Sequence, residues 1–325
     1  MSIVQLHHIR KVYDTKVAVE DLSFTIEPGT MFGLLGPNGS GKTSSIRMMI
    51  GITVPDSGSV SLFDRPFTRS ALSRVGYLPE ERGLYKKMNV LDQLIFLGQL
   101  HGLSAPVASR RASLWCERLD IVEAIPKKTE DLSKGMQQKI QFIAALLHDP
   151  DLILMDEPFS GLDPVNSFLL MSTLVDLCSI GKAVLFSTHR MDQVEKFCNN
   201  IALIHRGHLI LSGSMRQIKS SYPRNRVLIR YEGGDGFLQH PSIEHLKRYN
   251  GTVEIKLRPS ATLDDDVQSL LAQAIAHARV TRFEVMEPTL EEIFIEKVQR
   301  SLPIDNDHEL SMAQLDQPNA GGLDA

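Results

Sequence analysis

The stretch that decides the fold is a glycine-rich run between an apolar segment and a helical pattern. It reads Gly36-Pro37-Asn38-Gly39-Ser40-Gly41-Lys42-Thr43. Met31–Leu35 before it has the apolar character of a buried strand, and Ser44–Ile50 after it looks helical. Strand, glycine loop and helix, in that order, are what a phosphate-binding loop requires.

The residue types of this run suit a nucleoside triphosphate. Glycines let backbone N–H groups converge on phosphates, and the N-terminus of the following helix presents its positive end to them. Lys42 is expected to reach the β- and γ-phosphates, and the Thr43 hydroxyl to ligate Mg²⁺. A glycine-rich loop alone is often only a turn, but its flanking strand and helix favour nucleotide binding by this run and Ser44.

A second apolar run ends in two adjacent carboxylates. Leu152–Met155 reads as a buried strand, as does Ala183–Ser187 later in the chain, and Leu152–Met155 is followed by Asp156 and Glu157. Successive side chains of an extended chain point to opposite sides, so each carboxylate can have its own task. Asp156 suits the shell of a Mg²⁺ ion, and Glu157 suits a general base that polarises the attacking water. Such a pair in isolation is more often a helix cap or an ion-pair partner, but a phosphate loop upstream favours the catalytic interpretation.

Three more motifs complete a resemblance to the ATP-binding cassette (ABC) ATPases. Leu132-Ser133-Lys134-Gly135-Met136-Gln137-Gln138 resembles the family's signature, Ser160-Gly161-Leu162-Asp163-Pro164 its D-loop, and Ser187-Thr188-His189 its switch histidine. All five motifs occur in the family's order within residues 1–218. The resemblance implies an α/β P-loop NTPase fold: an ABC cassette with a mostly parallel core sheet, an antiparallel β subdomain and a helical subdomain.

The resemblance also implies roles for single residues. In this family two cassettes dimerise head to tail and hold ATP between the P-loop of one and the signature of the other. Tyr13 would stack on adenine, while Ser133 and Gly135 would contact the γ-phosphate from the opposite subunit. Asp163 would help to shape the dimer seam, and His189 would act in catalysis by holding the general base and the water in line. The alternatives are that Ser133 only caps a helix and that the histidine is structural.

Three positions depart from the family pattern. Lys134 and Met136 stand where the signature usually has glycine and glutamine, and Glu80 stands where the family has a metal-binding glutamine. Glu80 can also ligate Mg²⁺ through oxygen, with an added negative charge. These departures, with Leu290-Glu-Glu-Ile-Phe-Ile-Glu-Lys near the end, resemble bacterial ATPases paired with ABC-2 type permeases, including sodium-export ATPases.

The rest of the chain predicts two further parts. After a cassette at 1–220, residues 225–300 read as a small α+β accessory domain with strands at 226–231, 252–257 and 280–285 and a helix at 263–277. A last helix is expected after Pro288. The polar stretch 301–325, whose charges are almost all acidic, is expected to be a disordered tail.

Bulk properties limit the possible functions. Hydrophobic residues make up 42% of the chain, the formal net charge is −4, and no apolar run approaches the length of a membrane span. No basic field recruits nucleic acid, and three widely spaced cysteines suit reduced thiols. Within these limits, the resemblance implies an ATPase of the cytoplasmic membrane face, acting as a homodimer or mixed cassette pair and bound to a separate permease near residues 82–85. A non-transport cassette ATPase acting on ribosomes or DNA, and a nucleotide-binding module without turnover, are the alternatives.

Overall fold

The computed structural model describes residues 2–81, 83–260 and 262–301, excluding the side chains of the last two. The centre of the cassette is one mixed sheet, with strand order β5-β4-β1-β2-β10-β9-β3-β8-β7-β6. Its parallel strands are β3 (Met31–Leu35), β6 (Val75–Leu78), β7 (Leu152–Asp156), β8 (Ala183–Thr188) and β9 (Asn200–His205). The predicted strands at 31–35, 152–155 and 183–187 and the predicted parallel sheet are thus confirmed.

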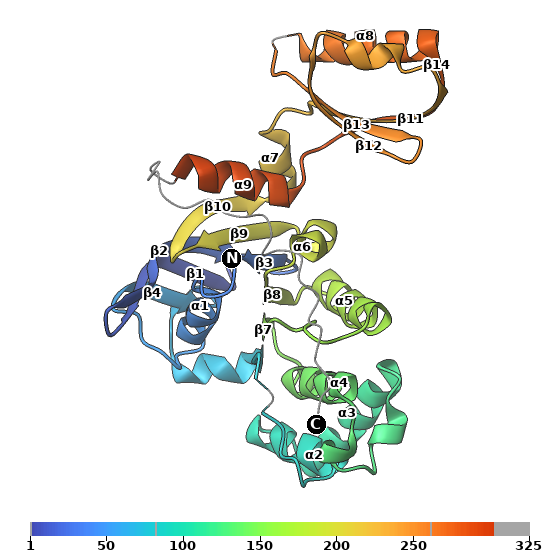
Figure 1. Cartoon of the computed structure of the whole chain (residues 1–325). Coiled ribbons are helices and arrows are strands. Elements are labelled where there is room, and N and C mark those ends of the chain that lie inside the picture. Colours follow the sequence, from blue (N-terminus) through green and yellow to red (C-terminus); the bar gives the residue numbers. More distant parts are fainter. Residues whose placement is uncertain (1, 82, 261, 302–325) are drawn as a thin grey trace, which may run out of the picture.

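The antiparallel subdomain lies at one edge of this sheet, on the blue side in Figure 1. It contains β1 (Val4–Tyr13), β2 (Lys16–Ile26), β4 (Ser57–Leu62) and β5 (Arg65–Pro66). The strand β10 (His208–Ser214) joins it to the parallel part, because it pairs antiparallel with β9 and parallel with β2. The antiparallel strands expected near the N-terminus are therefore present.

The side chains of β3 alternate between two hydrophobic clusters, which lie on opposite faces of the sheet. Met31 and Leu35 belong to one cluster, while Phe32 and Leu34 belong to the other. This follows from the period of two in a strand. The helix α1 (Lys42–Met49) packs on the second face, and α5 (Pro164–Ser179) and α6 (Met191–Phe197) pack on the first. The strand that leads to the glycine run is therefore covered on both sides.

A helical subdomain extends from the first face, at the bottom of Figure 1. It consists of α2 (Val90–Leu100), α3 (Ala105–Arg118) and α4 (Lys134–Leu146). Val90 and Leu94 are fully buried in the larger cluster of the cassette. One face of α2 therefore packs into the core.

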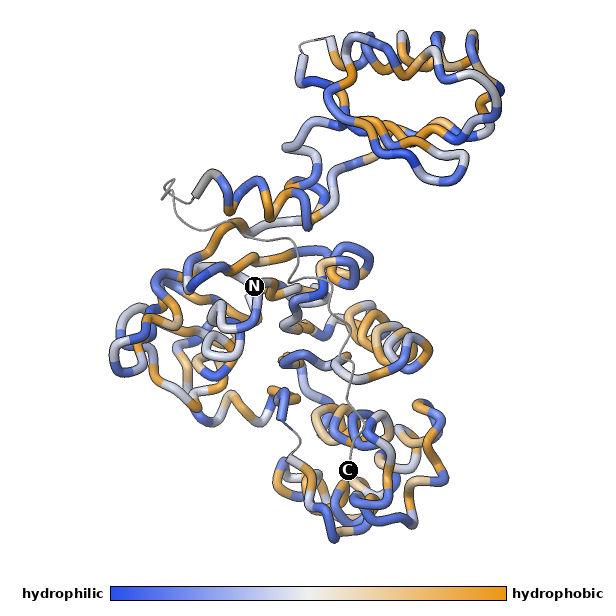
Figure 2. The backbone as a smooth tube through the Cα atoms, in the orientation of Figure 1, coloured by the Kyte–Doolittle hydropathy of each residue, from blue (hydrophilic) through white to orange (hydrophobic). Residues whose placement is uncertain are grey.

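The small domain has a sheet and core of its own. Its strands are β11 (Arg226–Gly233), β12 (Ile243–Tyr249), β13 (Thr252–Leu257) and β14 (Ala278–Met286), in the order β12-β13-β11-β14, with α8 (Leu263–His277) on one face. Apolar residues lie where α8 and the sheet face each other (Figure 2). Sequence patterning missed β12, because this edge strand exposes nearly every side chain and so lacks apolar alternation.

The last helix, α9 (Leu290–Ser301), packs on the cassette and lies between it and the small domain (Figure 1). The short α7 (Met215–Ser220) lies beside it at the other connection. Leu290 is buried in the same cluster as Val194 of α6, and Phe294 packs against that cluster. The expected accessory unit 225–300 thus includes a helix whose packing partner is the cassette.

The expected disorder of the acidic tail concerns residues 302–325, which lie outside the described residues. Among the described residues, no helix has the length and apolar character needed to span a bilayer.

We expect Leu290→Ala to destabilise the cassette, because Leu290 is only 2% exposed in its core. Truncating a buried leucine costs about 2–5 kcal/mol of unfolding free energy. The matched control is Ile295→Ala on the same helix, which is 47% exposed and should cost less than about 0.5 kcal/mol. Denaturant unfolding of both variants measures the difference, and equal losses would contradict the packing of α9 on the cassette.

Candidate nucleotide site

The glycine run forms a tight loop between β3 and α1 that admits no side chains at two positions. Gly36 has φ +154°, and a Cβ there would lie 2.2 Å from the Ile204 carbonyl oxygen. Gly41 has φ +112°, and its Cβ would lie 2.4 Å from the Ala18 carbonyl oxygen. Both are left-handed or related conformations that disfavour other residues. Glycine is therefore required at both positions, because any side chain there would collide with a neighbouring carbonyl oxygen.

The N-terminus of α1 is available to an anion. Gly41 precedes the helix, and no side chain among the described residues caps it. The first N–H groups of a helix lack intrahelical partners, and the helix dipole makes this end positive. Lys42, Thr43 and Ser44 of this first turn line one cavity at this end of the helix. This geometry agrees with the phosphate-binding role expected of these residues.

Lys42 connects the loop with the carboxylate pair. Its Nζ donates to the carbonyl oxygens of Gly36 at 2.8 Å and Pro37 at 3.2 Å, and lies 3.7 Å from Glu157 Oε1. Burial lowers the pKa of Lys42, while the charges of Glu157 and Asp156 act in the opposite direction. The ammonium group is thus held by acceptors that an incoming phosphate can replace.

Asp156 has one carboxylate oxygen bonded and one without a partner. Ser187 Oγ donates to Oδ1, whereas Oδ2 is buried and has no hydrogen-bond partner among the described residues. The side chain is only 1% exposed, and leaving such a group unsatisfied is costly. A hard cation such as Mg²⁺ prefers oxygen ligands and would satisfy it. Asp156 and the Thr43 hydroxyl, both lining the cavity, therefore fit a magnesium site.

Glu157 is held in a conformation that is uncommon for its type. Its φ is +47°, in the left-handed region that non-glycine residues seldom adopt. Its N–H donates to both oxygens of Ser187, at 3.2 Å to the carbonyl and 3.1 Å to the hydroxyl. Backbone strain of this kind is often stored at functional sites. Ser187 thus holds the Asp156 carboxylate and the Glu157 backbone, a role that sequence reasoning did not identify because β8 is remote in the chain.

His189 lies directly beside the proposed base. Its Nδ1 is 3.0 Å from Glu157 Oε1, and the two side chains are 53% and 11% exposed. The histidine follows the end of β8, next to β7 in the sheet, so the parallel register brings the two residues together. The structure therefore joins the two side chains that the sequence separates by a helix and a strand.

One cavity of about 340 Å³, a size typical of small-molecule sites, collects the loop residues and both carboxylates, while His189 contacts Glu157 without lining it. From the predicted set it is lined by Tyr13, Asn38, Gly39, Gly41, Lys42, Thr43, Ser44, Glu80, Asp156 and Glu157. Ser40 Oγ is buried and has no hydrogen-bond partner among the described residues. Lys16 and Ala18 also line the cavity. Sequence reasoning missed these two because the hairpin between β1 and β2 carries no local motif.

The remaining predicted residues lie apart from this cavity. Ser133 Oγ accepts a hydrogen bond from the Met136 N–H at 3.2 Å and so caps α4. Asp163 Oδ1 accepts one from the Asn166 N–H at 2.9 Å and caps α5, and this bond lowers the pKa of Asp163. Both side chains are exposed, as is Lys134. Within one chain, these residues and Gly135 do not complete the site, so their phosphate and dimer contacts stay predictions.

Comparisons with known proteins agree with this geometry. Residues 19–160 match the family described as ABC transporter, and residues 213–298 match the C-terminal domain of ATP-binding protein DrrA1-3-like proteins. The ABC transporter ATP-binding protein YhaQ of Bacillus subtilis (strain 168) is 41% identical over 297 residues, covering 91% of this chain and 98% of that protein. The linearmycin resistance ATP-binding protein LnrL of the same organism is 32% identical over 309 residues, covering 92% and 99%.

Solved structures show the same fold. An ATP-binding subunit of an ABC transporter superposes with a TM-score of 0.63 at 26% identity, over 68% of this chain and 93% of that one. The predicted fold class is confirmed, and the site geometry, the relatives and the solved structures agree. The chain therefore belongs to the ABC transporter ATP-binding proteins and carries a DrrA1-3-like C-terminal domain.

Proposed function

We propose that this chain hydrolyses ATP with Mg²⁺ in a head-to-tail pair of cassettes, and that the hydrolysis drives export through a separate ABC-2 type permease. The observation that carries the proposal is that Glu157, which lines the cavity of the glycine loop together with Lys42, contacts both Lys42 and His189. A base, its positioning partner and a phosphate-binding cation thus lie within hydrogen-bonding or ion-pair reach of one another.

The chemistry is in-line attack of water on the γ-phosphorus, which breaks its bond to the β–γ bridging oxygen and releases ADP and inorganic phosphate. The loop N–H groups and Lys42 bind the phosphates, and Lys42 exchanges its carbonyl acceptors for phosphate oxygens. Glu157 Oε1 accepts a proton from the attacking water, while His189 orients that carboxylate. Thr43, Asp156 and Glu80 would hold the Mg²⁺ ion, which would neutralise charge on the β- and γ-phosphates.

The other half of the site would come from a second cassette. Ser133 and Gly135 lie at the N-terminus of α4, away from the cavity of their own chain. A helix N-terminus favours anions, so this end of α4 suits the γ-phosphate of a partner cassette. Asp163 would order the D-loop at the seam through its cap of α5. The partner would be a second copy of this chain or a related cassette.

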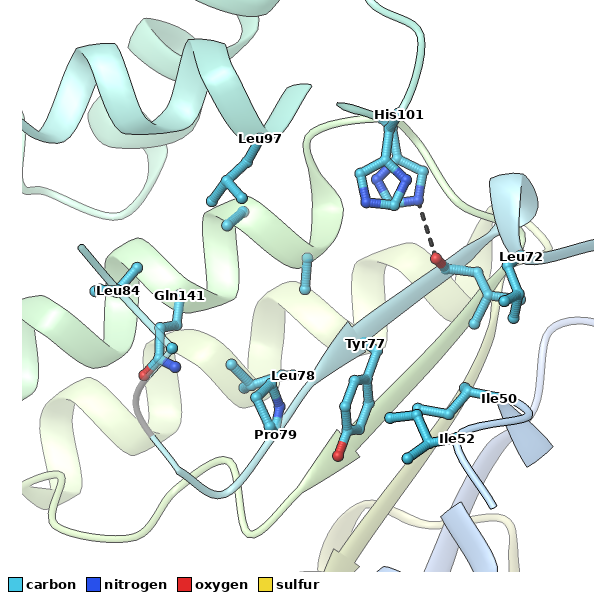
Figure 3. Close-up of a pocket in the computed structure, with 15 residues that line it drawn as sticks. Ile50, Ile52, Leu72, Tyr77, Leu78, Pro79, Leu84, Leu97, His101 and Gln141 are labelled. Atoms are coloured by element: carbon cyan, nitrogen blue, oxygen red, sulfur yellow. Dashed lines mark hydrogen bonds between the residues drawn. The ribbon is translucent and has the colours of Figure 1, made fainter. Parts of the chain in front are cut away.

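A groove between the antiparallel and helical subdomains suits the permease (Figure 3). It has a volume of about 420 Å³ and mostly apolar walls. Ile50, Ile52 and Leu72 line one side, and Leu84 and Leu97 line the other. Its walls come from two subdomains, so a change in the relative position of these subdomains would move an inserted segment. The occupant we propose is an amphipathic segment of the permease.

Exposed apolar side chains extend the groove at its rim. Ile52 and Val54 are 64% and 75% exposed on the side of the antiparallel subdomain. Tyr85 and Phe96 form an edge-to-face pair on the side of the helical subdomain, and Leu100 is 67% exposed. Apolar surface gathered in this way marks interaction sites. Of the predicted contact region 82–85, residue 82 lies outside the described residues, and Leu84 lines the groove.

The direction of transport is inferred from relatives. The Nod factor export ATP-binding protein I of Cupriavidus metallidurans (strain ATCC 43123 / DSM 2839 / NBRC 102507 / CH34) is 36% identical over 223 residues, covering 68% of this chain and 74% of that protein. Together with the resistance protein LnrL, it supports export. We place the chain at the cytoplasmic face of the membrane, where the permease would hold it, and we expect no role for nucleic acid. Its working parts would be the cassette 1–220 and the accessory unit 225–300.

Glu157→Gln should abolish turnover while preserving ATP binding. The amide keeps the size of the side chain but cannot accept the proton from water, so we expect kcat to fall by about 10²–10⁴. Steady-state ATPase assays and ATP binding measure the two effects, and size-exclusion chromatography with ATP should show a stabilised dimer. Turnover at the rate of the unmodified protein would refute the assignment of the base.

Lys42→Ala should weaken ATP binding itself. The substitution removes a charge that contacts the phosphates directly, and a charge-assisted hydrogen bond contributes about 1.5–3 kcal/mol. We therefore expect ATP affinity to fall by at least about tenfold. Titration with fluorescent ATP measures this, with Lys16→Ala at the edge of the same cavity as the comparison. Unchanged affinity would show that Lys42 does not contact the phosphates.

Ile52→Lys should release the permease without affecting basal ATPase activity. A charge in the groove would have to be buried by the docked segment, at a cost of several kcal/mol. Ile180→Lys is the matched control, because Ile180 is 71% exposed at the end of α5 and does not line the groove. Co-purification from membranes with the permease measures the effect, and equal recovery with both variants would argue against this docking surface.

A further inference from the structure

The helix α6 begins two residues after His189 and is enclosed on both sides. Its inner side rests on β3, where Val194 is fully buried against Gly33. A Cβ at Gly33 would lie only 2.5 Å from Val194 Cγ1, so the helix lies directly on the strand backbone. The same strand leads into the glycine loop. The position of α6 is thus coupled both to His189, which precedes it, and to the glycine loop, which follows β3.

On the outer side of α6, the side chain of Glu195 bonds to two other helices. Its Oε1 forms an ion pair with Lys219 Nζ in α7, and its Oε2 accepts a hydrogen bond of 3.3 Å from the Leu290 N–H at the start of α9. The Glu195 and Lys219 side chains are 24% and 17% exposed. Pairs shielded in this way are less weakened by solvent than exposed ones. One carboxylate therefore ties α6 to two other helices.

These two helices are the attachments of the small domain. α7 ends before β11, and α9 begins after β14, so the strands of the small domain lie in the chain between them. A cavity of about 870 Å³ lies between α9, the start of β11 and the segment 221–225, and Arg226 of β11 forms an ion pair with Glu292 of α9 at this cavity. The connecting segments are joined to each other by Arg224 and Glu287, at 2.6 Å. The cassette and the small domain thus meet through narrow connections, and Glu195 binds both of them.

We propose that Glu195 is a positioning residue for ATP hydrolysis, which holds α6 and hence His189 in place through α7 and α9. The inference rests on the proposed function, because it takes His189 as the group that orients the catalytic carboxylate. Loosening α6 would displace His189 from Glu157 and slow the chemical step. It would leave the phosphate contacts of the loop intact. A movement of the small domain would reach the site through the same carboxylate.

The experiment compares single and double variants of the full chain. Glu195→Ala removes both bonds, Glu195→Gln keeps an acceptor for the Leu290 N–H, and Glu287→Ala breaks the ion pair between the connecting segments without touching α6. Each is made alone, and Glu195→Ala is also combined with His189→Ala. ATPase kinetics give kcat and KM, single-turnover assays give the slow rates, and thermal unfolding gives the folded fraction.

We expect kcat of Glu195→Ala to fall about tenfold with KM for ATP within about twofold, since small displacements of catalytic groups are costly. Glu195→Gln should lose less, and Glu287→Ala should behave as the unmodified protein. In the His189→Ala background, Glu195→Ala should add no further loss, because both substitutions remove one function.

Independent losses in the double variant, or a kcat that follows only the folded fraction, would overturn the proposal. So would an unchanged kcat of Glu195→Ala beside an impaired His189→Ala. Full turnover of His189→Ala would instead contradict the role of His189 in the proposed function. The failure of one inference can therefore be told from the failure of the other.

Discussion

The close approach of backbone to backbone around the glycine loop is the constraint on which the rest of the structure depends. Gly36 and Gly41 pass so near the Ile204 and Ala18 carbonyls that no side chain fits. This brings the antiparallel hairpin, β9 and the start of α1 around one small volume. Lys42 can then bond to the loop carbonyls while its charge faces Glu157. Every other part of the site is placed relative to this contact, because the parallel strands β3, β8 and β7 end beside it in register.

The catalytic groups depend on the neighbouring strand ends for their conformation. Ser187 bonds to the Asp156 carboxylate through its hydroxyl and to the Glu157 N–H through both of its oxygens, so one residue of β8 holds the side chain of Asp156 and the backbone of Glu157. The left-handed backbone of Glu157 is a local cost that these bonds offset. The result is a carboxylate pair with divided tasks: one oxygen buried for a cation, the other side chain directed to His189.

Much of the fold was predictable from local pattern. The apolar runs of β3, β7 and β8 and the period of α8 are local signals, so their boundaries agreed with the sequence to within a residue or two. β12 was not predictable, because the exposed side chains of an edge strand carry no apolar alternation. The packing of α9 on the cassette was not predictable either. Leu290 and Ile293 form a buried face that is typical of any amphipathic helix, and such a face does not indicate which part of the protein covers it.

The sequence by itself determined the chemical inventory: a phosphate loop, two carboxylates, a histidine, and signature and D-loop motifs in the order of one family. These are properties of residue type and spacing, which do not depend on how the chain folds. Only the tertiary structure decided which of them meet. It joined His189 to Glu157, left Ser133 and Asp163 as helix caps outside the cavity, and linked Glu195 to both attachments of the small domain. The physical reason is that such contacts connect residues distant in the chain, and their distances follow from sheet register and helix packing rather than from any local preference.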